Sequence, residues 1–129
     1  MTLDTTQTIV AIATPPGMGA IAVLRLSGER SLEITSSVFR PAKKGKSLKE
    51  QKAYTIHYGS IVDGDREVDQ VLVSLFRAPH SYTGEDVVEI SCHGSTVIQQ
   101  QLLELLVRHG ARLAQPGEFT LRAFMNGKI

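Results

Sequence analysis

The sequence predicts an α+β fold, in which a mixed, mainly antiparallel sheet carries flanking helices. Short β-branched or alternating runs, typical of strands, recur along the whole chain. Three other segments have the apolar spacing or the flanking residues of helices. Strands and helices do not alternate strictly, as they would in a βαβ fold, and 129 residues give room for one core. We therefore expect a single domain over residues 1–129.

The first third of the chain is expected to form two strands and a helix. Residues 8–14 and 21–26 are short, β-branched and apolar, which predicts buried strands. The turn between them, residues 15–20, lacks the Gly-Lys-Ser/Thr ending of a phosphate-binding loop and precedes a strand. Its glycines are therefore expected to permit a tight turn with positive φ. A helix is expected over residues 31–39, because Pro41 cannot continue it.

The middle of the chain predicts a hairpin and a further strand. Tyr54, Ile56 and Tyr58 alternate with other residues in the period-2 pattern of a half-buried strand. The sequence Asp-Gly-Asp at residues 63–65 is a hairpin turn signal, and it leads into a strand over residues 68–76. A polar loop over residues 77–86 then precedes a strand over residues 87–92.

The last third predicts two helices around a short strand. Ser95 is suited to cap a helix whose apolar residues follow at helical spacing and which ends at Gly110. A short strand is expected over residues 111–114 and a helix over residues 117–125. The segment 116–128 is dense in charge, aromatic and turn residues, which is unusual at a chain terminus. We expect Lys128 to act inside a larger protein.

The charge balance argues against a main nucleic-acid surface. Lys plus Arg is 14 and Asp plus Glu is 13, so the formal net charge is only +1. One basic cluster, opposed only by Glu50, comprises Arg40, Lys43, Lys44, Lys46, Lys49 and Lys52. We interpret this cluster as a solvated, mobile loop, and an accessory contact to RNA is the alternative.

The composition is that of a cytoplasmic protein without a membrane partner. No apolar run approaches the roughly 20 residues that cross a bilayer, and residues 1–7 have no secretory signal. The single cysteine, Cys92, excludes an internal disulfide and suits a reducing compartment. Cys92 and His93 adjoin along a strand, so they point to opposite faces and Cys92 is expected to be buried and inert. The other histidines have no metal-ligand spacing, so we predict neither a catalytic residue nor a metal site.

Two charges interrupt apolar strands. Arg25 shares a side with Ile21 and Val23 in a run that otherwise reads as core, and Glu89 lies in a similar run. A buried charge needs a counter-ion, so one interpretation is that the two residues form a structural ion pair, or that each of them sits on an exposed edge. The other interpretation is a pocket wall, where Glu89 would accept two N–H bonds from a guanidine-like heterocycle edge. Arg25 and Lys128 would then bind anionic groups, and the loop 81–86 would border the pocket.

Five stretches together resemble the N-terminal domain of the MnmE (TrmE) family of tRNA-modification GTPases. They occur in the family's order and span nearly the whole chain, at residues 8–17, 19–28, 81–90, 92–94 and 116–128. The resemblance implies a fold similar to the tetrahydrofolate-binding part of the glycine-cleavage T protein. It also implies homodimerisation and binding of a 5-formyl-tetrahydrofolate-type folate near the dimer interface. The family's folate contacts fall on Arg25, Glu89 and Lys128. By their chemistry, Glu89 suits the amino edge of the pterin and the two cations suit carboxylate or carbonyl groups.

The resemblance further implies a role in a larger system. Family members act with the flavoprotein MnmG on the wobble uridine of certain tRNAs, and a separate domain binds GTP, Mg²⁺ and K⁺. This chain has no Gly-x-x-x-x-Gly-Lys-Ser/Thr motif, so we expect a folate-binding dimerisation module of a GTP hydrolase, without activity of its own. One alternative is a purely structural dimerisation domain in which Arg25 and Glu89 pair only with each other. The other is a stand-alone folate-dependent one-carbon transferase, which the length and the absence of a convincing catalytic acid or base disfavour.

Overall fold

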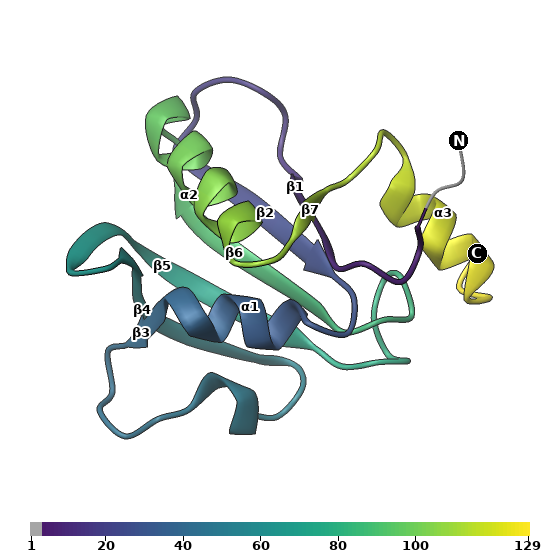
Figure 1. Cartoon of the computed structure of the whole chain (residues 1–129), viewed down its shortest axis with the longest axis horizontal. Helices are drawn as coiled ribbons and strands as arrows, with labels where there is room; N and C mark the ends of the chain where they lie inside the picture. Colours follow the sequence, from purple (N-terminus) through teal and green to yellow (C-terminus); the bar gives the residue numbers. More distant parts are fainter. Residues whose placement is uncertain (1–3) are drawn as a thin grey trace.

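Seven strands form one sheet in the order β3-β4-β5-β6-β2-β1-β7 (Figure 1). The computed structural model describes residues 4–129, and residues 1–3, the start of the segment expected to lack a secretory signal, lie outside it. All neighbouring strands pair antiparallel except β1 and β7, which are parallel. The predicted α+β class with a mixed, mainly antiparallel sheet is therefore confirmed.

The element bounds follow the predicted order closely. The strands are β1 (Ile9–Ile12), β2 (Ile21–Ser27), β3 (Phe39–Pro41), β4 (Thr55–Asp63), β5 (Arg66–Phe76), β6 (Val87–His93) and β7 (Arg112–Leu113). The helices are α1 (Ser31–Val38), α2 (Thr96–Arg108) and α3 (Glu118–Met125), with one 3₁₀ turn, η1 (Leu48–Glu50).

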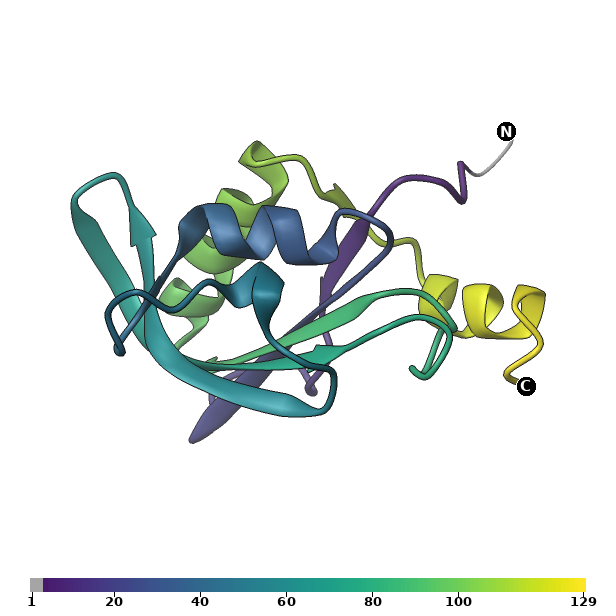
Figure 2. The same cartoon turned by 90° about the horizontal axis from the view of Figure 1, so that it is seen from below.

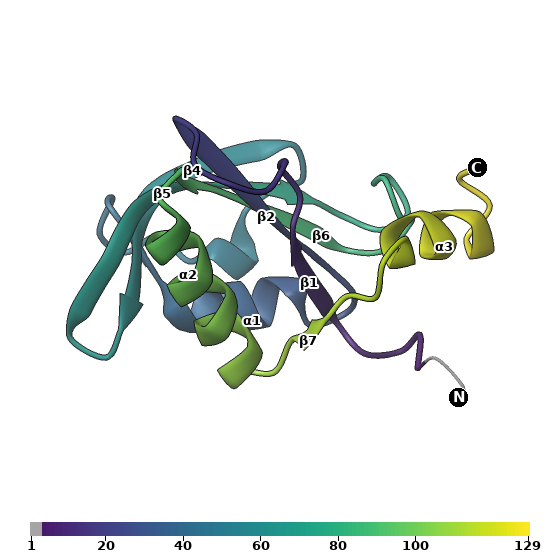
Figure 3. The same ribbon diagram turned by 90° about the horizontal axis from the view of Figure 1, so that it is seen from above.

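The helices divide into a covering pair and a helix beyond the end of the sheet. α1 and α2 lie on the same face of the sheet (Figures 1 and 2). α3 lies past the ends of the central strands, beside the loop that joins β5 to β6 (Figure 3). Among residues 4–129, no helix is long and apolar enough to cross a membrane.

Local signals explain most of the element ends. The Ser95 side chain accepts a hydrogen bond from the Ile98 N–H and caps α2, as predicted. The turn before β2 and the β4–β5 hairpin both use a glycine with positive φ, at Gly17 (104°) and Gly64 (63°). The helix predicted to reach residue 39 ends at Val38, because Phe39 begins β3. Strand β3 tolerates Pro41 because β3 is an edge strand, where the N–H that proline lacks is not needed for pairing.

The two faces of the sheet differ in what covers them. Leu24 and Leu26 of β2 are fully buried beneath the helices with the rest of the core. The side that carries Ile21, Val23 and Arg25 is the open face, so the expectation of a buried strand holds for Leu24 and Leu26 and was wrong for Ile21. The alternation in β4 is confirmed, but Ile56 and Tyr58 lie on the open face, 65% and 51% exposed, and His57 is buried. The helices cover one face only, so the apolar side chains of the other face stay in solvent.

Candidate functional site

Arg25 and Glu89 lie directly opposite each other on the open face of the sheet. They are register partners in the antiparallel pair of β2 and β6. Arg25 Nε donates to Glu89 Oε2 at 2.8 Å, and the two side chains are 27% and 28% exposed. The ion pair that the sequence left as one alternative is therefore present. Glu89 keeps a second carboxylate oxygen for other donors.

Two aromatic rings flank the Arg25 guanidinium. Its carbon Cζ lies 5.5 Å from the centroid of Tyr82 and 5.5 Å from that of Phe119. Both distances are within the range of cation–π attraction, which orients the guanidinium between the rings. Tyr82 belongs to the loop 81–86, so this loop lies beside Arg25.

A cavity of about 400 Å³ opens beside Arg25. Its wall combines β1, the residues after β7 and the start of α3, with Arg25, Tyr82, Phe119 and Thr120 among the lining side chains. The volume lies within the ~300–1,000 Å³ range typical of small-molecule sites. Hence a basic group, aromatic rings and backbone converge on one hollow.

Of the three predicted site residues only Arg25 lines this cavity; Glu89 and Lys128 do not. A side-chain carbon placed on Gly84 would be 3.4 Å from Lys128 Cγ, so the lysine stem lies against the loop 81–86. Asn126 Nδ2 donates to the Thr83 carbonyl at 2.9 Å, and the Tyr82 and Thr120 hydroxyls are 2.9 Å apart. The end of α3 is thus held against the loop that also carries Tyr82.

A buried ion network fixes α3 in place. Arg122 is 1% exposed, and its Nη1 donates to Glu85 at 3.1 Å. Its Nη2 donates to the Gln7 carbonyl at 2.6 Å and to Glu118 Oε2 at 3.3 Å. This network was not predicted from the sequence, although the i,i+4 spacing of Glu118 and Arg122 on one helix face was a signal for a pair. Its effect is to hold Phe119, on the same helix, against Arg25.

Glu118 is the most buried carboxylate of the network, at 1% exposed. Burial raises the pKa of Glu118, but hydrogen bonds from Arg112 and from the Gln115 N–H, with the charge of Arg122, outweigh it and hold this pKa below its ordinary 4.5. Arg112 Nη2 reaches Glu118 Oε2 at 2.7 Å. Glu118 is therefore ionised at neutral pH and is structural in role.

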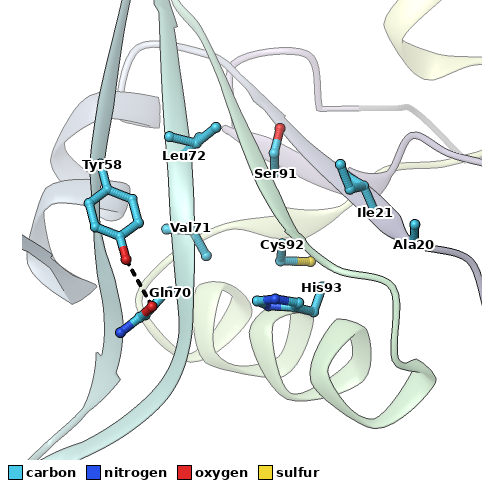
Figure 4. A pocket seen from close by; sticks show the side chains of 9 residues that line it. All are labelled: Ala20, Ile21, Tyr58, Gln70, Val71, Leu72, Ser91, Cys92 and His93. Carbon is cyan, nitrogen blue, oxygen red and sulfur yellow. Dashed lines mark hydrogen bonds between the residues drawn. The ribbon is translucent and has the colours of Figure 1, made fainter.

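An apolar strip runs across the open face of the sheet. We define the open strip as Ile21, Ile56, Tyr58 and Leu72, which are 66%, 65%, 51% and 45% exposed. A hollow of about 180 Å³ lies between β2, β5 and β6, with Ile21, Tyr58 and Leu72 in its lining (Figure 4). The Tyr58 hydroxyl donates to Gln70 Oε1 at 2.8 Å at its border. The strip and the Arg25 cavity share the open face.

Cys92 and His93 separate as predicted. Cys92 is 4% exposed, and burial, with the charge of Asp69, raises its pKa to about 11, so the thiol is unreactive at neutral pH. His93 Nδ1 lies 2.7 Å from Asp69 Oδ1, a partner that was not predicted from the sequence. Over residues 4–129, no three His, Cys, Asp or Glu side chains gather in a way that could hold a metal ion.

Comparison with known proteins gives one consistent match. The family model described as the GTP-binding protein TrmE N-terminus matches residues 8–128. A tRNA modification GTPase MnmE of Parabacteroides distasonis is 61% identical over 124 residues, which cover 95% of this chain and 27% of the relative. Proteins of the same name are 60% identical in Bacteroides thetaiotaomicron and 54% identical in Enterococcus faecalis, each over 95% of this chain and 26% of the relative. The chain thus spans about a quarter of the length of these curated relatives.

Proposed function

Because this chain belongs to the family of the GTP-binding protein TrmE N-terminus, we propose that it is the folate-binding and self-associating module of a tRNA-modification GTPase. The observation that carries the proposal is the position of Arg25, which lines a cavity together with Tyr82 and Phe119 and is paired with Glu89. The module has no chemistry of its own in this proposal. It binds a ligand and a second copy of itself.

The donor set around Arg25 suits a reduced folate. A pterin is a flat heterocycle with a guanidine-like N–H edge, and a carboxylate accepts such an edge through parallel hydrogen bonds. Glu89 offers an oxygen that is free of Arg25, and the rings of Tyr82 and Phe119 supply apolar surface for a flat ring system. The two Nη groups of Arg25 make no hydrogen bond to protein within residues 4–129, which leaves them for a carbonyl or carboxylate of the ligand.

Lys128 has an outer role in this proposal. Its stem lies against Gly84, one residue from Thr83, whose carbonyl accepts from Asn126. A four-carbon side chain from this position could extend over the loop toward anionic groups at the mouth of the cavity. We assign Lys128 to the glutamate carboxylates of the folate, and Glu89 to the amino edge of the pterin.

The open strip supports self-association through the same face. Its four apolar side chains lie on three of four adjacent strands, and the register pairs Tyr58 with Leu72. Such a patch on a sheet face is typical of an interaction surface. A second copy would cover the strip, and because Arg25 shares this face with Ile21 and Val23, the folate would lie close to the interface. Homodimerisation and the placement of folate near it are what the resemblance implies for the family.

The larger protein supplies the remaining functions in this proposal. Its other parts would bind GTP, Mg²⁺ and K⁺, and it would act with MnmG on the wobble uridine of certain tRNAs, in the cytoplasm. Similarity to the glycine-cleavage T protein also stays a prediction.

A purely structural dimerisation domain is the second candidate. The observation that favours it is the 2.8 Å ion pair, because Arg25 and Glu89 already neutralise each other without a ligand. The two candidates differ in whether the parent protein binds folate at all.

Calorimetric titration with 5-formyl-tetrahydrofolate tests the proposal. We expect saturable binding by the parent and a loss of about tenfold or more in Glu89→Ala, since a hydrogen bond to a charged group contributes roughly 1.5–3 kcal/mol. The matched control is Glu33→Ala, which removes an ion-paired but exposed carboxylate on α1 and should bind like the parent. Sedimentation of the same samples should give a dimer that Leu72→Glu dissociates. A dimeric parent without folate binding would establish the structural alternative.

A further inference from the structure

A cluster of cations lies on β3, an edge strand of the sheet, and on the segment that joins it to β4 (Figure 1). We define the β3 basic surface by its six members, Arg40, Lys43, Lys44, Lys46, Lys49 and Lys52. All are exposed except Lys46, which is partly buried. Within residues 4–129, none of the six forms an ion pair with a carboxylate. Glu50 and Glu33 lie nearby, but two negative charges do not balance the six cations, so the cluster is strongly positive.

The backbone that carries these cations is anchored to the fold. Leu48, in η1, is 2% exposed and belongs to the hydrophobic core. Arg77 Nη2, from the end of β5, donates to the carbonyls of Lys49 at 2.9 Å and Gln51 at 3.0 Å. Gln51 Nε2 in turn donates to the Ser47 carbonyl at 3.0 Å. The segment therefore presents its lysines from defined positions, in contrast with the mobile loop expected from the sequence.

The surface includes a concave part. Lys43, Lys44, Lys46 and Gln51 line a hollow of about 340 Å³ with Gly45. The charge of Lys46 also acts on the buried His57. Burial is the larger cause and the Lys46 charge the smaller cause that hold the pKa of His57 below 6.5. Repulsion among unpaired cations disfavours this arrangement unless an anion binds there. Several cations around a hollow fit a chain of phosphates better than a single small anion.

We propose that the β3 basic surface is an accessory contact for the sugar–phosphate backbone of the tRNA substrate. This inference rests on the proposed function, because that function supplies an RNA partner. An RNA strand fits the concave, lysine-lined segment, whereas a lipid headgroup layer would require a flat surface with apolar residues beside the lysines. The exposed Tyr54, two residues after Lys52, adds an aromatic ring on which a base can stack.

The hollow lined by Lys43, Lys44 and Lys46 and the Arg25 cavity have no lining residue in common. Strands β4, β5 and β6 lie between β3 and the β2 strand of Arg25. At about 4.8 Å per strand, β3 lies roughly 19 Å from β2. Tyr54 lies closer to the cavity, because its hydroxyl donates to the His80 carbonyl in the loop that leads to Tyr82. The three lysines can therefore be varied without changing the lining of the Arg25 cavity.

The test is fluorescence anisotropy of a labelled, unmodified tRNA transcript with the purified chain between about 50 and 200 mM salt. Neutralising three lysines, in K43Q/K44Q/K46Q, should weaken binding at least tenfold and lower the slope of log K against log salt by about 2 to 3. The control is R66Q/R108Q, which removes two charges from exposed arginines that pair with Asp63 at the β4–β5 hairpin. This control should bind tRNA within about twofold of the parent.

The outcomes separate this inference from the proposed function. Absence of tRNA binding by a parent that binds 5-formyl-tetrahydrofolate overturns the inference and leaves the folate proposal standing. Equal weakening per charge removed in the lysine variant and in the arginine control overturns it as a general charge effect. Tighter binding to phosphatidylcholine vesicles with about 30% phosphatidylserine overturns it in favour of a lipid surface. Lysine-dependent tRNA binding without folate binding supports the inference and refutes the folate proposal.

Discussion

Two arginines near the same loop, Arg25 and Arg122, have opposite environments. Arg122 is buried and meets two carboxylates and the Gln7 carbonyl. Arg25 is 27% exposed, meets one carboxylate through Nε and lies beside a cavity between two rings. The difference shows that the same fold uses one arginine for structure and leaves the other available for a ligand. Arg122, whose two Nη groups both bind protein, holds α3, whereas Arg25 keeps its Nη groups for a ligand.

Removing each arginine in turn should show the difference between them most clearly, as a difference in the free energy of unfolding. We expect Arg122→Met to lower the free energy of unfolding by roughly 3–5 kcal/mol, because Glu118 and Glu85 lose a buried partner. Arg25→Met, the matched control, should cost about 1 kcal/mol or less, since its ion pair is partly solvated. Urea denaturation followed by circular dichroism measures both. Equal losses would show that Arg25 is as structural as Arg122.

Acid should weaken the ion pair between Arg122 and Glu118. The pKa of Glu118 is below 4.5 in the folded protein, so the unfolded chain takes up this proton first as the pH falls. The stability that Glu118 contributes is present above about pH 4.5 and is lost as the pH falls through the folded pKa. We expect Glu118→Gln to be less stable than the parent near neutral pH and the difference to shrink on acidification.

Urea midpoints of the parent and of Glu118→Gln at several pH values give this measurement. Asp4, Glu33 and Asp63 also have lowered pKa values, but they are present in both proteins and cancel in the difference. A difference that stays constant down to about pH 3 would mean that Glu118 does not titrate as its contacts imply.

The smallest expected effect concerns the loop between the two arginines. Tyr82→Phe removes the hydroxyl that lies 2.9 Å from Thr120 Oγ1 and keeps the ring over Arg25. The loss should be about 0.5–1 kcal/mol in the same denaturation assay, because this hydrogen bond is exposed to water. Affinity for 5-formyl-tetrahydrofolate should change by less than about threefold if the ring, and not the hydroxyl, serves the cavity. A destabilisation as large as that of Arg122→Met would place Tyr82 in the structural network instead.

The sequence predicted the elements and one of the two arginine environments. Periodicity and turn residues identified six of the strands, because strands and helices have different side-chain spacing. Strand β3 was missed, since three residues around Pro41 have no periodicity to detect. Arg25 and Glu89 could be related to each other because each was a single charge in an apolar strand.

The Arg122 network could not be found in this way. Its partners lie far along the chain, at Glu85 and Gln7, and only the folded sheet brings them together. The open face was also hidden, because an alternating pattern shows that a strand has two faces but not which one the helices cover. The missing information in both cases was tertiary: the position of α3 and the coverage of the sheet by α1 and α2 on one side.

The open strip also makes protein concentration a variable in every stability measurement. If a second copy covers Ile21, Ile56, Tyr58 and Leu72, mass action favours the folded dimer, and the melting temperature rises as the sample is concentrated. A destabilised variant then shifts two linked equilibria, folding and association. Differences between variants are therefore comparable only at one subunit concentration, and their change on dilution reports how much of the fold's stability each copy receives from the other.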